Sequence, residues 1–169
     1  MTPVRAYLIA AFVFIADQLS KFWIMEGLDL DTIGHVPLLP FLSFTWVENT
    51  GVAMGMLDGG GADFARWGLV VLTGAISIAI LWWINGERDR TDLFAMSLIL
   101  GGALGNIVDR IRLGYVADFI HVFVGDWSFY VFNVADAAIS IGVAILLIRA
   151  FFWPDAKKGR KTTAIGESE

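Results

Sequence analysis

The sequence contains no cysteine and only two histidines, His35 and His121. The absence of cysteine excludes disulfides, thiolate metal ligands and a cysteine nucleophile within this chain. Two histidines this far apart are too few for a histidine-rich metal site. We therefore expect neither a metal nor any other cofactor.

Charged residues are also scarce, at 17% of 169 residues, against about a quarter in soluble domains. The formal net charge is −5, and we expect no nucleic-acid partner for a chain this acidic. Hydrophobic residues make up 57%, and the mean hydropathy is +0.67. One soluble core of this size cannot cover so much apolar surface, so the composition predicts an integral membrane protein.

Apolar residues are concentrated in four stretches, at about residues 4–25, 64–84, 93–109 and 132–153. Each is close to the roughly 20 residues that a helix needs to cross a bilayer. The first stretch is interpreted as a retained span rather than a cleaved signal peptide, because no A-x-A-like site follows it. We predict a membrane all-α fold with four transmembrane helices, in one domain over residues 1–169 with a polar tail at 155–169.

The basic residues indicate how these spans are oriented. Arg5 precedes the first span, Arg88 and Arg90 separate the second from the third, and four basic residues lie in the tail. The loop over residues 26–60 contains no Lys or Arg. By the positive-inside rule both termini are cytoplasmic, and residues 26–63 and about 109–130 lie outside. Arg110 and Arg112 weaken the bias of the second outer segment without reversing it.

The first outer loop contains a strand-like segment. Large apolar residues alternate with smaller ones over residues 42–47, and the turn-prone Asn49-Thr50-Gly51 follows. Pro37 and Pro40 limit how far the strand extends upstream. We expect a small sheet on the outer membrane surface, over about residues 35–57.

Two groups of small and polar residues occur inside the predicted spans. Asp17 and Lys21 are four residues apart, on one helix face, where they can pair. That pair is either structural, with Lys21 reaching outward to the interface, or in contact with substrate or lipid. Residues 101–105 contain three glycines and predict close helix packing. Beyond them, Asn106 can cross-link helices, and Asp109 can form a local charge pair with Arg110.

Asp118 and Asp136 are the most informative pair. One follows the third span and the other begins the fourth, so both carboxylates belong to the same face of the membrane. If they are close, they share a proton, because two like charges do not ionise easily together. One carboxylate then takes a proton from water while the other donates one, as in an aspartic protease. Spacing alone leaves three alternatives open: Asp136 caps a helix with Asn133, Asp118 pairs with Arg110 or Arg112, or both form a transport relay.

Five segments resemble the lipoprotein signal peptidase family, the bacterial type II signal peptidases. They are residues 14–21 (FIADQLSK), 48–53 (ENTGVA), 101–110 (GGALGNIVDR), 114–120 (GYVADFI) and 132–136 (FNVAD). Their order and spacing cover the chain from about residue 10 to 150. Two small departures are visible. Ala117 stands where the family often has valine, and the interval from Asp118 to Asp136 is as short as the family shows.

The resemblance implies an aspartic endopeptidase of the bacterial inner membrane, with four helices, a periplasmic β-cradle and its active site at the periplasmic face. Its substrate is a prolipoprotein that carries a diacylglyceryl group on a cysteine, and it cleaves just before that cysteine. The implied catalytic dyad is Asp118 and Asp136. Membrane lipid and globomycin-type inhibitors are further implied partners. Residues implied to line or support the site are Asp17, Lys21, Asn49, Gly51, Asn106, Asp109, Arg110, Asn133 and Ala135.

Two other functions remain as alternatives. A small proton-coupled transporter would use the same two aspartates as a relay, and a non-catalytic membrane scaffold would need neither. We assign no catalytic role to His121, since an interfacial histidine is usually only a hydrogen-bonding residue.

Overall fold

The computed structural model describes residues 1–51, 61–125 and 127–152. Its helices are α1 (Pro3–Phe22), continued by the π-helical turn η1 (Trp23–Gly27), then α2 (Leu30–Ile33), α3 (Gly61–Gly86), α4 (Arg90–Arg112) and α5 (Val134–Phe152). Its strands are β1 (His35–Leu39), β2 (Leu42–Asn49), β3 (Val116–Val124) and β4 (Trp127–Ser128). Within these residues four helices are long and apolar enough to cross a membrane, which confirms the prediction of four spans.

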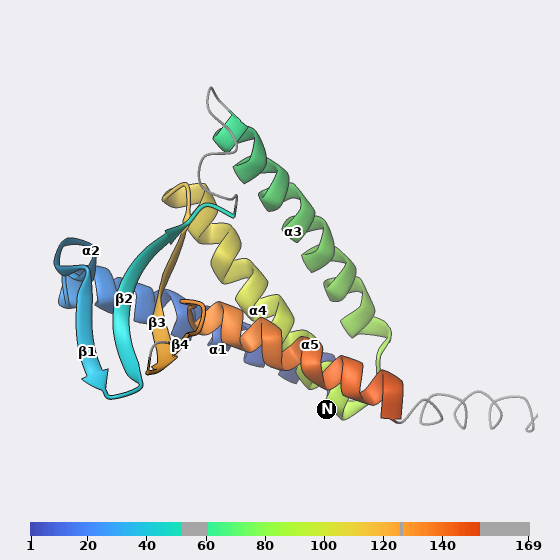
Figure 1. Cartoon of the computed structure of the whole chain (residues 1–169). Coiled ribbons are helices and arrows are strands. Elements are labelled where there is room, and N and C mark those ends of the chain that lie inside the picture. The colour runs from blue at the N-terminus through green and yellow to red at the C-terminus, as the bar shows by residue number, and fades with distance from the viewer. Residues whose placement is uncertain (52–60, 126, 153–169) are drawn as a thin grey trace, which may run out of the picture.

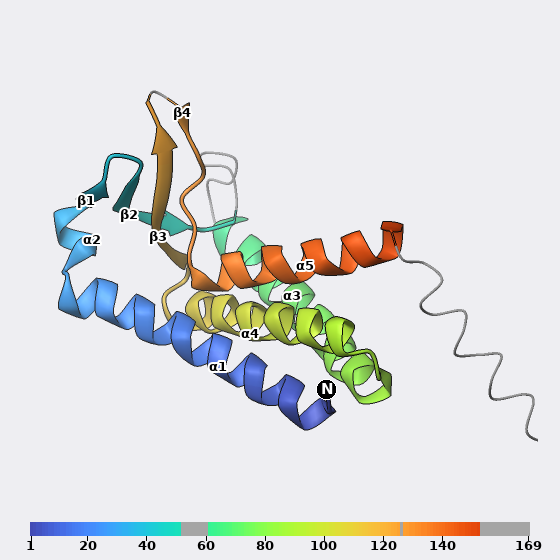
Figure 2. The same ribbon diagram turned by 90° about the horizontal axis from the view of Figure 1, so that it is seen from below.

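The four long helices run back and forth between two ends of the molecule, as Figures 1 and 2 show. The N-terminus, the α3–α4 connection and the end of α5 lie at one end, and the sheet lies at the other. This alternation agrees with the predicted order of the spans, while the assignment of the two ends to cytoplasm and exterior stays a prediction. Arg149 of α5 pairs with Asp89 and Asp92 at the start of α4, both at 2.9 Å, and holds the first end together.

Helix α4 is the central helix and packs against α1, α3 and α5. Its glycines permit this, because a Cβ on Gly101 would lie 2.5 Å from the Ala10 carbonyl oxygen of α1. A Cβ on Gly102 would collide with the Ala135 carbonyl oxygen of α5. The predicted close packing at residues 101–105 is therefore confirmed, and any larger side chain there would push a neighbouring helix away.

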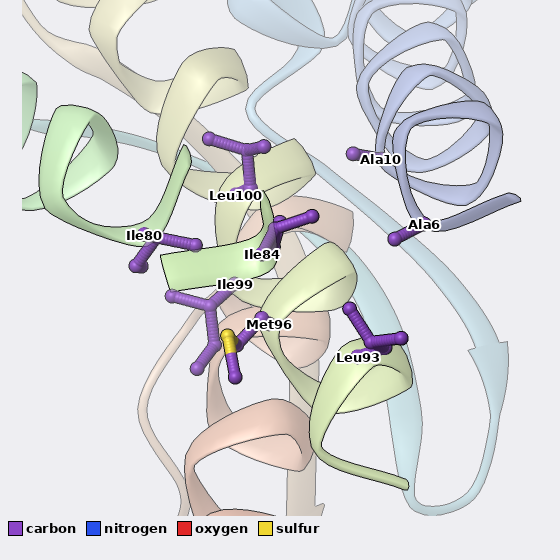
Figure 3. Packing of buried hydrophobic residues seen from close by; sticks show 8 residues of the cluster. All are labelled: Ala6, Ala10, Ile80, Ile84, Leu93, Met96, Ile99 and Leu100. Atoms are coloured by element: carbon purple, nitrogen blue, oxygen red, sulfur yellow. The ribbon is translucent and has the colours of Figure 1, made fainter. Parts of the chain in front are cut away.

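Buried apolar side chains of α1, α3 and α4 form a core near the end opposite the sheet (Figure 3). Its members are Ala6, Ala10, Ile80, Ile84, Leu93, Met96, Ile99 and Leu100. A second cluster of Ile24, Leu30 and Phe119 joins the end of α1 to the sheet. The outer faces of the helices remain apolar and exposed, with Leu8 at 65% and Phe64 at 84%. Such faces suit a bilayer, where lipid is the solvent.

The sheet is antiparallel in the order β1-β2-β3-β4. β2 pairs with β3 so that Val47 lies opposite Asp118, with an irregularity in register between Phe44 and Val47. Strands β1 and β2 confirm the strand-like character of the first outer loop, whereas residues 52–57 of the expected cradle lie outside the described residues, as does the 155–169 tail. β3 and β4, which make up two of the four strands in the described residues, were not predicted from the sequence.

Candidate active site

Asp118 lies on β3 and is fully buried. Two amides hold its carboxylate: Asn49 Nδ2 of β2 donates to Oδ2 at 2.9 Å, and Asn133 Nδ2 donates to Oδ1 at 2.7 Å. The pKa of Asp118 is raised to about 6: burial is the largest cause, the Asp136 charge acts in the same direction, and the two amide hydrogen bonds and the Lys21 charge oppose the rise. Asp118 therefore takes up a proton far more readily than an ordinary aspartate, and it feels the charge of Asp136.

Asp136 lies in the first turn of α5, where the helix starts beside β3 (Figures 1 and 2). Asn133 caps this helix, since its Oδ1 accepts from Asp136 N at 2.9 Å. Asn106 Nδ2 of α4 donates to Asp136 Oδ1 at 2.8 Å. The capping role left open for Asp136 thus belongs to Asn133, and the Asp136 carboxylate stays half-buried and available.

Asn133 and Asn106 connect the two aspartates. Asn133 donates to Asp118 and also, at 3.3 Å, to Asn106 Oδ1, while Asn106 donates to Asp136. The carboxylates from β3 and α5 thus belong to one hydrogen-bonded cluster. Among the ion pairs of the described residues, none joins Asp118 to Arg110 or Arg112, so that alternative is wrong.

The buried Lys21 pairs with two further carboxylates beside this cluster and bonds to Asn106 within it. Lys21 Nζ lies 2.8 Å from Asp17 Oδ2 and 2.7 Å from Asp109 Oδ2, and it donates to Asn106 Oδ1 at 3.3 Å. The predicted pairing of Asp17 with Lys21 is confirmed. Lys21 does not reach outward, however, because it is only 3% exposed. Asp109 pairs with Lys21 rather than with Arg110, so the expected local charge pair is wrong.

The carboxylates of Asp17 and Asp109, which pair with Lys21, also accept hydrogen bonds from the backbone next to Asp136 and Asp118. Asp17 Oδ1 accepts from Ala135 N at 2.9 Å, one residue before Asp136. Asp109 Oδ2 accepts from Ala117 N at 3.2 Å, one residue before Asp118. A single ammonium group thus fixes both carboxylates, and these fix the positions of Asp118 and Asp136.

Arg110 and Gly51 lie at the edge of the same cluster. Arg110 Nη1 donates to Asn106 O at 3.4 Å, and its guanidinium interacts electrostatically with Asp136, Asp118 and Asp109. Gly51 has φ +75°, and a Cβ there would lie 3.6 Å from Arg110 Nη2 and collide with Leu69 of α3. Glycine therefore serves both the backbone conformation and the close approach of α3.

An apolar groove of about 570 Å³ opens beside Asp136. Its polar lining residues are Asn49, Tyr130, Asp136 and Ser140, and the remainder is aromatic and aliphatic. Ile141, on the wall formed by α5, is 54% exposed. An apolar ligand bound in this groove would therefore lie beside the Asp136 carboxylate.

The structure brings together every candidate site residue that the sequence singled out. Two further contributors were missed. Gln18 Nε2 bonds Asp17, Asp109 and the Gly105 carbonyl at 3.0–3.4 Å, and its place on the Asp17–Lys21 helix face was the available signal. The Tyr130 hydroxyl accepts from Asn49 Nδ2 at 3.1 Å, and no sequence signal identified it. Within the described residues, no group of three or more potential ligands could hold a metal.

Comparison with known proteins agrees with this architecture. The family described as "Signal peptidase (SPase) II" matches residues 9–152. The lipoprotein signal peptidase of Rhizorhabdus wittichii is 49% identical over 150 residues, which cover 88% of this chain and 87% of that protein. The lipoprotein signal peptidase of Sphingopyxis alaskensis is 45% identical over 142 residues, covering 83% and 82%.

Solved structures resemble the fold as well. One described as a bacterial membrane enzyme, determined by the in meso method at 2.3 Å resolution, aligns with a TM-score of 0.71 at 31% identity. The alignment covers 98% of this chain and 93% of that chain. With four membrane helices, a small antiparallel sheet and this extent of similarity, the chain belongs to the signal peptidase II family, the lipoprotein signal peptidases.

Proposed function

We propose that this chain is an aspartic endopeptidase that removes the signal peptide from diacylglyceryl-modified prolipoproteins by cleaving just before the lipidated cysteine. Asp118 and Asp136 form the catalytic dyad. The observation that carries this proposal is that two asparagine side chains connect the carboxylates of Asp118 and Asp136 in one hydrogen-bonded cluster, and that Asp136 also lines an apolar groove. Neither the fold nor the relatives favour the transporter or scaffold alternatives.

The dyad works with one shared proton. The ionised carboxylate takes a proton from a water molecule as that water attacks the scissile carbonyl carbon. The protonated carboxylic acid donates to the carbonyl oxygen, which gives a neutral tetrahedral diol. As the C–N bond breaks, the dyad donates one proton to the departing amine and takes one back from a hydroxyl of the diol, so the product is a carboxylic acid and the dyad again holds one proton. Because the pair titrates as a unit, neither aspartate is given a fixed role. The pKa of about 6 at Asp118, raised by burial and by Asp136, supports proton sharing near neutral pH.

The groove suits a lipidated precursor. A signal-peptide helix and two acyl chains partition into lipid, and the apolar side chains of α5 that line the groove offer them a surface beside Asp136. The scissile bond must also meet water, so the reaction belongs at the lipid–water interface. The distribution of Lys and Arg supports the periplasmic face of the bacterial inner membrane as that interface. Globomycin-type peptides are expected to occupy the same groove.

The proposal is tested with purified protein in detergent, given a lipidated and an unlipidated precursor, each with and without globomycin. Only the lipidated precursor should be cleaved, and globomycin should stop the reaction. Asp118→Asn and Asp136→Asn should each abolish cleavage while the protein stays folded.

Asp31→Asn is the matched control, since Asp31 is an exposed aspartate of α2 on the sheet side of the molecule. It should cleave at the wild-type rate. Turnover close to wild type in either dyad variant would show that the dyad assignment is wrong, and equal cleavage of both precursors would show that the lipid is not recognised.

A further inference from the structure

A second groove lies at the end of the molecule opposite the sheet. It has a volume of about 670 Å³ and is lined by Met1, Thr2, Arg5, Leu8, Ile9 and Arg90. These residues belong to the start of α1 and the first residue of α4. Figures 1 and 2 both show the N-terminus beside the start of α4 and far from β3. The groove therefore takes no part in the proposed cleavage site.

Three positive charges gather at this groove: the Met1 ammonium, Arg5 and Arg90. Burial, and then the charges of Arg90 and Arg5, lower the pKa of the Met1 amino group, and the Asp89 carboxylate opposes part of this shift. Within residues 1–51, 61–125 and 127–152, no carboxylate forms an ion pair with any of the three. The adjacent Asp89 instead bonds Arg149 at 2.9 Å and the Thr91 N–H at 2.8 Å.

The helix dipole adds to this positive charge. α1 is 20 residues long, and its first turn contains no acidic residue. Its N-terminal end, which borders the groove, thus carries the partial positive charge of the helix with no acidic side chain in its own first turn, and the opposing charge of Asp89 is already paired with Arg149. The groove is electrostatically complementary to an anion such as a phosphate group.

The groove continues from its charged rim onto an apolar wall. Leu8 and Ile9 lie three and four residues after Arg5, on the same face of α1 and about 5 Å further along the span. Leu8 is 65% exposed, so this wall faces the hydrocarbon of the bilayer. A phospholipid matches this arrangement, because it has an anionic phosphate for the arginines and an apolar acyl chain for the wall.

We propose that this groove binds an anionic phospholipid, with its phosphate between Arg5, Arg90 and the Met1 ammonium and an acyl chain along Leu8 and Ile9. A soluble phosphate compound would satisfy the cations but leave the apolar wall unused. A zwitterionic lipid would bring its own ammonium group against three cations. The charge and the shape of the groove thus both select an anionic lipid.

The test is a titration of the purified full-length chain in detergent, followed by native mass spectrometry, with phosphatidylglycerol and with phosphatidylcholine of the same acyl chains. The unmodified chain should bind phosphatidylglycerol more tightly. Arg5→Gln combined with Arg90→Gln should weaken that binding about 25-fold, at about fivefold per arginine. Arg88→Gln is the matched control, because Arg88 is exposed in the same region and does not line the groove. Its binding should match the wild type.

Each result decides the proposal. Equal binding of the two lipids by the unmodified chain overturns it, and that comparison needs no variant to fold. Binding of phosphatidylglycerol that persists in the double variant, or that is lost equally in Arg88→Gln, also overturns it. Displacement of phosphatidylglycerol by an equal concentration of glycerol 3-phosphate would show a soluble phosphate site instead. Cleavage of the lipidated precursor should continue in the double variant, which confirms that it is folded.

Discussion

Lys21→Met should be among the most destabilising single substitutions in this chain. The variant leaves the carboxylates of Asp17 and Asp109, which are 0% and 3% exposed, without the ammonium that lies 2.8 and 2.7 Å from them. Removing one partner of a buried charge pair costs about 3–5 kcal/mol. Gln18 keeps its hydrogen bonds to both carboxylates and limits the loss. At about 2–4 °C per kcal/mol for a chain of this size, Tm should fall by about 6–20 °C.

The measurement is thermal unfolding in detergent, followed by the fluorescence of the seven tryptophans. Arg112→Gln serves as the control, because Arg112 is an exposed cation at the end of α4, and its Tm should stay within about 2 °C of the wild type. Combining Lys21→Met with Asp17→Asn and Asp109→Asn should recover most of the loss, since no buried charge is then left unpaired. A single variant that melts with the wild type, or a triple variant no better than the single, would refute this reasoning.

Three further outcomes follow from the site and the helix packing. Burial raises the pKa of Asp118, and the Asn49 amide opposes that rise. Asn49→Ala should therefore raise this pKa further and move the acidic limb of the pH–rate profile for cleavage to higher pH. An unmoved limb contradicts the assignment of Asp118 as a catalytic residue. Because the folded-state pKa of about 6 exceeds the ordinary 3.8, the stabilisation from Asp118 is complete below pH 3.8 and lost as pH rises through 6. The Tm difference between Asp118→Asn and the wild type should therefore be more favourable to the variant at pH 8 than at pH 4. An equal Tm difference at the two pH values would count against a raised pKa. Gly102→Ala places a methyl group against the Ala135 carbonyl and should cost about 1–3 kcal/mol, whereas Gly74→Ala, which meets open space, should gain up to about 1 kcal/mol; equal Tm values would refute the packing argument.

The helices were predictable from the sequence because the bilayer imposes a simple rule on length and polarity. The third span was still placed too narrowly, at about 93–109 against Arg90–Arg112. Charged residues near both ends made the helix look shorter than it is. In the structure Asp92 pairs with Arg149, and Asp109 pairs with Lys21, inside the bundle. A hydropathy pattern cannot anticipate that a partner on another helix will neutralise a charge.

The site was partly predictable for a related reason. Polar residues are rare in apolar spans, so Asp17, Lys21, Asn106 and Asp136 stand out wherever they occur. β3 was missed although Val116–Val124 is rich in β-branched and aromatic residues, because its pairing with β2 depends on chain folding over long sequence distance. Tyr130 resembles any other interfacial aromatic residue, and only the structure shows its contact with Asn49.

The central position of α4 bears on how the protein is made. α1 and α3 leave the ribosome first, yet they have little contact with each other and pack mainly on α4, which is synthesised after both. Until it arrives, the side chains of Asp17 and Lys21 have as partners only each other and, for Asp17, the neighbouring Gln18 of the same helix. Membrane insertion of the first two spans must therefore precede their association, and the polar groups of α1 lack most of their final partners until the third long helix enters the membrane.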